Sequence, residues 1–531
     1  MKRTLLGLVS LALTASPLFA ATPSSAATPA AITREVLSPI YTIDKKYRSM
    51  EGPGDTQTIY LEEGAAPELL WVTGVRTEMV GEDGKTPQLP EFMCHVNVDI
   101  DPSRHQQILG LKRMGGTRLI TLSQGMLAMK TPKGFAYPLA SNEPIQLYTQ
   151  VLNHNILEPK NAKVRHKVTF EYYRERDLAG TSMKPLLNFG ASGMVLLTED
   201  PKAAPSPVDL GGEHGATCLM AQRAPNAPGK SADYVDPEGR RLTGHWVVPP
   251  GRQTNHSDVT WFMSLPYDTK LHYAAIHLHP FAESLEMRDV TAKKSLFKVQ
   301  TKNPKGKVGL DHVDTFVSTE GVPLYRNHKY ELISVYNNTT KETHDSMASV
   351  FLGVLDPDFT KPDAAGLQER ASLLALASLS DNVMLHTSAG AFGITLARAE
   401  SPDAVRQFLR LAQTGAFTDA KITSTVDAGV PALTFTAKLD KTKKLFQRLA
   451  VEDGKHQSGS LSVCPADQTE ETFTFSVMLG KATHRDGKCT AFALIGPGMD
   501  VLRTLTATQD ASLSKAELFT KSAEPVARGG M

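Results

Sequence analysis

The stretch LHYAAIHLHPF, residues 271–281, sets two histidines at alternate positions in an apolar run. Such alternation predicts a β-strand, in which side chains two residues apart point to the same face. We therefore expect His277 and His279 to share one face of a sheet. Two imidazoles placed in this way can hold one metal ion, and histidines with a purely structural role are the alternative.

Segments of β character surround this strand on both sides. Residues 34–197 and 243–359 each contain short alternating runs, rich in β-branched and aromatic residues and separated by Gly, Pro and Asn. Between them, residues 198–242 are rich in Pro, Gly and Ala and predict a linker or long loop. The N-terminal two thirds of the chain are therefore expected to be mainly β.

The first 20 residues, MKRTLLGLVSLALTASPLFA, have the layout of a secretory signal: a basic end, a short apolar core and a small residue at the cleavage point. We expect a secreted or periplasmic protein with no membrane span. The formal charge is +1, from 57 Lys and Arg against 56 Asp and Glu. This balance, without a basic patch, gives no support to nucleic acid as a partner.

A methionine that follows the histidine pair in the sequence affects which metal is expected. Met347, in ETHDSMASVFLGV, lies 68 residues after His279, and its thioether is a soft ligand that suits copper. The alternative is a cupin-like set of His277, His279 and Glu283, which suits non-haem iron or manganese. That alternative lacks a good second histidine motif, because Tyr325 stands where a Gly is expected.

This order of His-x-His and a later Met resembles the catalytic domain of the copper type II, ascorbate-dependent monooxygenases, the family of peptidylglycine alpha-hydroxylating and dopamine beta-monooxygenases. GHWVVPPGRQTNHS and GVPLYRNHKYELISVYNNTT fit the same domain. The resemblance implies two jelly-roll-like antiparallel β-sandwich domains. It also implies that His277, His279 and Met347 are the catalytic copper ligands, where O₂ is activated with ascorbate or another reductant as electron donor.

The same family has a second, electron-donating copper in its first domain, so one or two copper ions are implied. His95, in EFMCHVNVDI, and His154, in IQLYTQVLNHN, match two of its three histidines, and Cys94 replaces the third. The peptide-hydroxylating members carry substrate-holding Arg and Tyr residues where this chain has Ala275 and Phe351. The substrate, a small molecule or a peptide, is therefore not identified by the resemblance.

Residues 380–520 resemble a cyclophilin, the prolyl-isomerase β-barrel with flanking helices. SAGAFGITLARAESPDAVRQFLRLAQTGAFTDAKI (388–422) and RDGKCTAFALIGPGMDVLRTL (485–505) carry the resemblance. Thr423 and Ser424 stand where cyclophilins place a catalytic Arg, Phe475 matches an aromatic residue of the substrate pocket, and Cys489 replaces a His. These departures predict an inactive module that contacts a protein partner.

The chain has four cysteines, too few for a disulfide scaffold. Cys464 and Cys489 are close in sequence and can pair in an oxidising compartment, whereas the states of Cys94 and Cys218 stay open. Taken together, the sequence predicts a copper-dependent monooxygenase with a cyclophilin-like module. The alternatives are a copper-binding or protein-interaction module of the cell envelope without catalysis, and a peptidyl-prolyl isomerase.

Overall fold

The computed structural model describes residues 30–521, apart from 48–50, 63, 65, 179, 197–232, 444, 448 and 453. The expected signal sequence, Cys218 and most of the expected loop 198–242 lie outside the described residues. Within this part of the chain, no helix is long and apolar enough to cross a bilayer.

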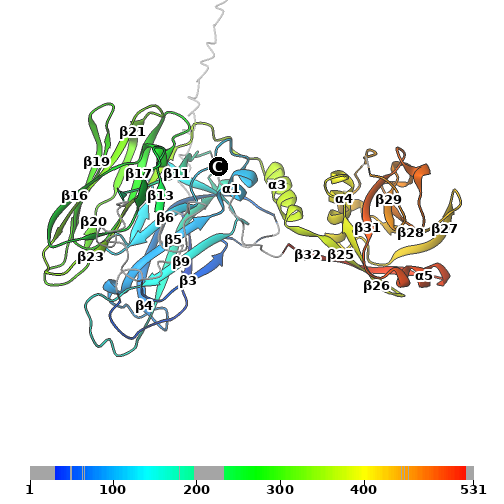
Figure 1. Ribbon diagram of the computed structural model, residues 1–531, viewed down its shortest axis with the longest axis horizontal. Coiled ribbons are helices and arrows are strands. Elements are labelled where there is room, and N and C mark those ends of the chain that lie inside the picture. The colour runs from blue at the N-terminus through cyan, green and yellow to red at the C-terminus, as the bar shows by residue number, and fades with distance from the viewer. Residues whose placement is uncertain are drawn as a thin grey trace, which may run out of the picture.

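A ten-stranded sheet runs through both halves of the N-terminal region (Figure 1). Its members, from one edge to the other with two side strands, are β1 (Ile32–Leu37), β2 (Tyr41–Ile43), β10 (Ala162–Arg174), β4 (Leu69–Gly81), β7 (Ala128–Lys130), β8 (Phe135–Ala140), β11 (Lys184–Ser192), β24 (Ala348–Leu355), β17 (Thr269–Leu278) and β21 (Phe316–Leu324). The pairing of β11 with β24 joins the two expected sandwiches, because β11 lies near the end of the first and β24 near the end of the second.

Two further sheets pack on this one. The first contains β3 (Gly54–Ile59), β9 (Ile145–Val151), β5 (Met93–Ile100) and β6 (Arg118–Ser123). The second contains β16 (Gly251–Asp258), β22 (Tyr330–Asn338), β18 (Ala282–Asp289), β19 (Lys294–Lys302) and β20 (His312–Val313). Buried side chains from all three sheets form one hydrophobic core, so the two halves are not separately packed units.

Two details of the strand pairing add to the expected sandwiches and loop. β8 and β11 pair in parallel, with Lys184 opposite Phe135. Short strands on both sides of residues 197–232, and others further along the chain, belong to small sheets. These are β12 (Val195–Leu196), β14 (Arg241–Thr243) and β13 (Asp233–Val235), and further along the chain β15 (Trp246–Val248) and β23 (His344–Ser346).

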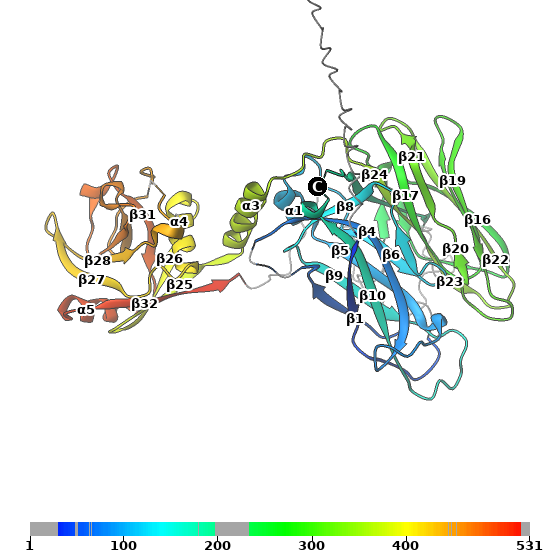
Figure 2. The ribbon, with the colours of Figure 1, turned by 180° about the vertical axis from the view of Figure 1, so that it is seen from behind.

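Helix α3 (Ala364–Ala377) connects the sandwiches to the C-terminal domain and lies between them in Figures 1 and 2. Asp363 caps its first turn by accepting a hydrogen bond from the Gly366 amide. The helix packs on α1 (Pro102–Leu109), and the Arg370 guanidinium donates to the Ile108 carbonyl at 2.8 Å.

The C-terminal domain is a closed barrel of eight strands, which confirms the predicted β-barrel. In barrel order they are β25 (Leu379–Thr387), β26 (Gly390–Leu396), β31 (Thr490–Ile495), β29 (Ser460–Val463), β30 (Thr472–Met478), β28 (Val430–Lys438), β27 (Ala420–Asp427) and β32 (Ser512–Thr520). The remaining helices of the described residues are α2 (Thr260–Met263), α4 (Pro402–Gln413), α5 (Met499–Ala507) and the 3-10 turns η1 (Pro90–Phe92), η2 (Glu175–Asp177), η3 (Lys441–Lys443), η4 (Pro465–Asp467) and η5 (Thr483–Arg485).

Aromatic rings fill the barrel, and a disulfide closes one end of it. Phe435 and Phe475 stack at 4.8 Å between ring centroids. Phe475 is therefore a core residue, which corrects its assignment to a substrate pocket. Cys464 and Cys489, which the sequence allows to pair, form a disulfide that joins the end of β29 to the start of β31.

Acidification is expected to destabilise the sandwiches through His166. Its ring is fully buried on β10, where burial lowers its pKa to about 4, although its Nε2 lies 3.0 Å from the Gln150 carbonyl. A histidine in the unfolded chain has a pKa near 6.5, so the contribution of His166 to stability is fully present above that pH. It is lost as the pH falls from about 6.5 to about 4, by about 3 kcal/mol. Denaturant unfolding at pH 7 and pH 4.5 measures the loss, and His166→Gln is expected to make it smaller; an unchanged loss in that variant contradicts the assignment.

Breaking the disulfide is expected to destabilise the barrel. The cysteines are separated by 25 residues. Closing a loop of that length reduces the entropy of the unfolded chain enough to contribute about 3 kcal/mol. The double variant Cys464→Ser/Cys489→Ser is therefore expected to have a lower melting temperature than the oxidised wild type. The same is expected of the wild type after reduction. A double variant with the same melting temperature as the oxidised wild type would show that the disulfide does not stabilise the barrel.

Candidate metal centre and barrel face

The histidine pair sits where β17 leaves the large sheet. His277 lies on the strand, His279 directly follows it, and their ring centroids are 5.3 Å apart. Both side chains are buried. β17 is a central strand, buried on both faces, which explains its nearly continuous apolar sequence.

The first sandwich contributes a third ring to the same place. His95 on β5 is buried, and its ring centroid is 6.1 Å from that of His277. β6, the partner of β5, contacts both β17 and β24, which brings these segments together. His154, just after β9, lies within electrostatic range of His279 and Asp345. Predicted ligands of both sites therefore meet at one interface between the sandwiches.

Three buried ring nitrogens in this cluster have no hydrogen-bond partner among the described residues: His95 Nε2, His154 Nε2 and His277 Nδ1. Burial, more than the neighbouring charges, holds the pKa of His95 and of His277 well below the usual range, and lowers that of His154 to about 4. The rings are thus neutral at physiological pH. A neutral imidazole with an unused nitrogen is a potential metal ligand, and leaving such a group buried and unpaired costs about 1–3 kcal/mol.

Two polar neighbours orient the rings. Cys94 Sγ lies 3.2 Å from His95 Nδ1, and Asp345 Oδ2 lies 3.2 Å from His279 Nδ1. These contacts direct Nε2 of each ring away from its partner. A carboxylate behind a histidine is typical of metal sites, where it fixes the ring and raises its basicity. Sequence reasoning missed Asp345, although its place two residues before Met347 is a usable signal.

Met347 is fully buried and immediately precedes β24. In the register of β17 with β24, His277 lies opposite Ser349 and Leu278 opposite Ala348. One more step places Met347 opposite His279. In the part of the chain that is described, no three His, Cys, Asp or Glu side chains are already arranged to hold a metal ion. The ligand sets His277–His279–Met347 and Cys94–His95–His154 thus stay predictions.

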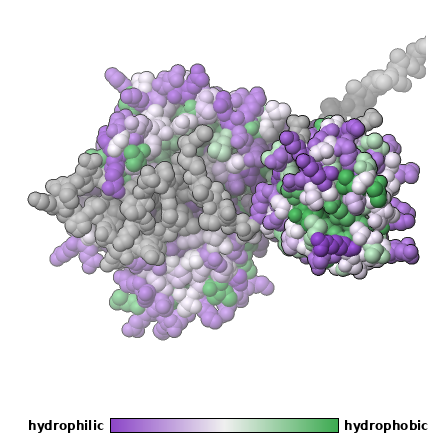
Figure 3. Space-filling view, turned by 45° about the vertical axis from the view of Figure 1, so that its right-hand side comes forward, coloured by the Kyte–Doolittle hydropathy of each residue, from purple (hydrophilic) through white to green (hydrophobic). Residues whose placement is uncertain are grey.

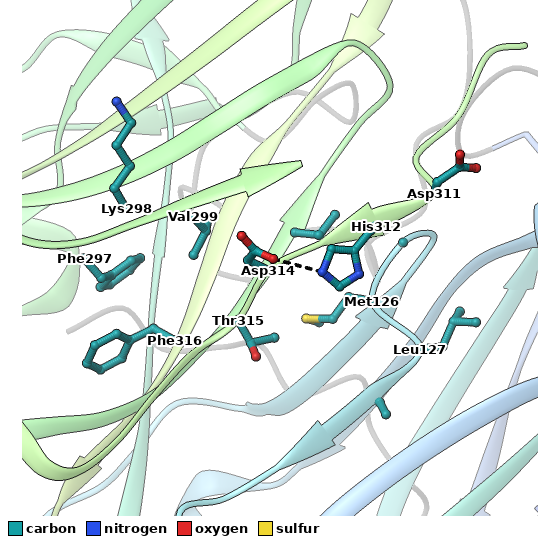
Figure 4. A pocket seen from close by; sticks show the side chains of 13 residues that line it. Met126, Leu127, Phe297, Lys298, Val299, Asp311, His312, Asp314, Thr315 and Phe316 are labelled. Carbon is teal, nitrogen blue, oxygen red and sulfur yellow. Dashed lines mark hydrogen bonds and ion pairs between the residues drawn. The ribbon is translucent and has the colours of Figure 1, made fainter. Parts of the chain in front are cut away.

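A hollow of about 650 Å³ opens between the two sandwiches (Figure 4). One wall is the turn at Met126 and Leu127, and the other comes from β19, β20 and the start of β21. Phe297 and Phe316 stack on one side, and a 2.9 Å hydrogen bond between His312 Nε2 and Asp314 Oδ1 lies on the other. The hollow can take a ligand with both an apolar and a polar part.

On the barrel, a row of hydroxyl groups crosses the four neighbouring strands β27, β28, β30 and β29. The Thr425 and Thr434 hydroxyls are 3.2 Å apart, as are those of Thr434 and Ser476, and Ser462 lies opposite Ser476 in the register. Thr423 also belongs to this row, since it lies opposite Thr434. The position expected to carry a guanidinium is therefore part of a hydroxyl-lined surface.

The row ends in a charged network. Arg485 donates to the Asp427 carboxylate and, at 3.2 Å, to Ser462 Oγ. His456 connects Ser462 Oγ at 2.8 Å to Asp486 at 2.9 Å, the same order of groups as in serine hydrolases. Ser462 is only 1% exposed and its oxygen already accepts from Arg485, so the network fastens the loops to the barrel.

The comparisons place the barrel in a known family. Residues 382–522 match the family model described as cyclophilin type peptidyl-prolyl cis-trans isomerase/CLD. Among solved structures, a cyclophilin-type isomerase of Cryptosporidium parvum is 14% identical, with a TM-score of 0.21, and the match covers 27% of this chain and 99% of that one. The same isomerase in the presence of the dipeptide Ala-Pro gives 16% identity and a TM-score of 0.20, with the same coverage. No curated protein matches the chain. The C-terminal domain is thus a cyclophilin-type domain.

Proposed function

We propose that the C-terminal domain binds proline-containing segments of peptides or proteins. The match of residues 382–522 to the cyclophilin-type family, on a closed eight-stranded barrel, is the observation that carries this proposal. Figure 3 shows apolar side chains gathered on the side of this domain that faces the viewer. Exposed apolar surface of this kind suits a peptide partner. The large exposed apolar side chains of the domain are Val426, Val451, Leu494, Met499 and Phe519.

The side chains on this face of the barrel favour binding of a proline-containing segment without rapid isomerisation. Rotation about an X–Pro bond has a barrier of about 18–20 kcal/mol, and a cation close to the prolyl amide lowers it by weakening the partial double bond. Thr423 and Ser424 offer no such cation. The nearby guanidinium of Arg485 is already engaged by Asp427 and Ser462.

This proposal predicts peptide binding with an uncatalysed exchange rate. The full chain, added to a proline-containing peptide, is expected to shift the peptide's NMR signals, while cis–trans exchange stays on the scale of tens to hundreds of seconds. Exchange faster than this background would show an active isomerase. The variant Arg485→Ala then tells whether Arg485 supplies the cation. Unshifted signals reject peptide binding itself.

For the sandwiches we propose copper binding by His277, His279 and Met347. The three buried, unpartnered imidazole nitrogens at this interface support a metal, and the thioether of Met347 favours copper over hard cations. When bound, copper supplies one-electron chemistry with O₂, for which ascorbate or another reductant would provide electrons. The chain itself would exclude water, since these side chains are buried in the core.

Hydroxylation of a substrate other than a glycine-extended peptide is the activity that such a site would serve. Ala275 and Phe351 lie directly opposite each other in β17 and β24, and both are buried. Neither side chain can hold a carboxylate. The hollow beside Phe297 and Phe316 supports a substrate with an apolar part. A copper-binding module without turnover is the alternative.

Copper content distinguishes these possibilities. We expect the wild type to retain copper after dialysis and to consume O₂ when ascorbate is added. Met347→Leu keeps the side-chain volume but removes the sulfur, so it is expected to weaken Cu(I) binding without unfolding the core. Met287→Leu, at an equally buried methionine on β18, is the matched control.

Wild-type protein without copper would reject the proposal. Equal losses in Met347→Leu and Met287→Leu would reject Met347 as a ligand. Copper that is retained while O₂ uptake stays at background favours the module without turnover.

A further inference from the structure

The resemblance implies two separate copper sites, one in each sandwich, but the structure brings their histidines together. His95 of the first half and His277 of the second are 6.1 Å apart between ring centroids, and His279 is 5.3 Å from His277. We propose that His95, His277 and His279 bind one metal ion that is shared between the two sandwiches. This inference rests on the proposed copper binding and changes its ligand set.

The spacing of the rings is that of ligands on a single ion. An imidazole nitrogen about 2.0 Å from a metal puts the ring centroid about 3.2 Å from it, so two rings on one ion are about 5 Å apart at the tetrahedral angle and about 6.4 Å apart on opposite sides. Both measured separations fall in this interval. Among the described residues no three such side chains are already arranged around a metal ion, so the rings would have to turn about their side-chain bonds to direct their nitrogens to a common point.

Each of the three rings has a nitrogen that can bind a metal ion. His95 uses Nδ1 toward Cys94 Sγ and His279 uses Nδ1 toward Asp345, which leaves Nε2 of both for a metal. His277 Nδ1 is buried without a partner among the described residues. An ion at this point would satisfy the unpartnered nitrogens of both His95 and His277.

The backbone holds His277 in place relative to the first sandwich without the ion. β11 and β24 are paired from Leu186–Leu355 to Ser192–Ser349, and Ser349 is in turn opposite His277. The side chains of Ser192 and Ser349 are 3.0 Å apart, which ties the two halves next to the cluster. A shared ion therefore binds to a preformed interface and adds a link between the sandwiches.

Copper binding by the full-length protein tests the shared site. The variants are His95→Ala, His277→Ala and the pair combined, with His272→Ala as the matched control. His272 is buried on the same strand, but its Nδ1 lies 2.9 Å from the Ser318 carbonyl and its ring stacks on Phe135. Thermal melting of the metal-free proteins checks that each variant is folded.

We expect one tightly bound copper per wild-type chain. His95→Ala and His277→Ala are each expected to lower the copper affinity by more than roughly 10–100-fold, the loss typical when a residue that only supports a ligand is changed. The double variant is expected to lower it by less than the product of the two effects, because both rings bind the same ion. His272→Ala leaves the affinity unchanged. Pulsed EPR of the Cu(II)-loaded wild type, which needs no variant, is expected to show three coordinating imidazoles.

Two coppers per chain, of which each variant loses a different one, overturn the shared site but leave copper binding intact. The same holds for unchanged affinity in His95→Ala, or for only two imidazoles in the EPR spectrum. A wild type that binds no copper overturns the proposed copper function itself, so the two failures are distinguishable.

Discussion

Antiparallel pairing between β11 and β24 is the constraint on which the rest of the N-terminal region depends. It makes one continuous sheet out of strands that are more than 150 residues apart in sequence, with Ser192 opposite Ser349. The next strand across is β17, so the register also fixes His277 relative to the first sandwich. Because backbone hydrogen bonds set this arrangement, the position of His277 on the sheet does not depend on a bound metal.

Much of this was predictable from local patterns. Period-two alternation predicted the His277 strand, and the resemblance to cyclophilins predicted the barrel and its extent. The meeting of His95 with His277 could not be predicted, because it follows from a pairing between distant strands that no local pattern encodes. Phe475 was misplaced for a related reason: whether a strand residue faces inward depends on register, and a shift of one residue reverses the face.

The two buried polar clusters of this chain illustrate how hydrogen bonding separates structural from functional groups. In the barrel, both ring nitrogens of His456 are bonded, and Ser462 accepts from Arg485. That network is complete without a ligand. Its resemblance to a hydrolase triad therefore carries no catalytic meaning, since a nucleophile must be reachable and have an unoccupied place for the substrate.

In the histidine cluster between the sandwiches, by contrast, the hydrogen bonding is incomplete. Nitrogens of His95, His154 and His277 are desolvated without a hydrogen bond from the described residues. Burial without compensation lowers stability, because each desolvated polar group loses its hydrogen bonds to water. Three of them in one place, with Asp345 positioned behind His279, are difficult to explain as packing alone. A metal ion offsets this cost for several rings at once, which is the physical reason to look for copper here rather than in the barrel.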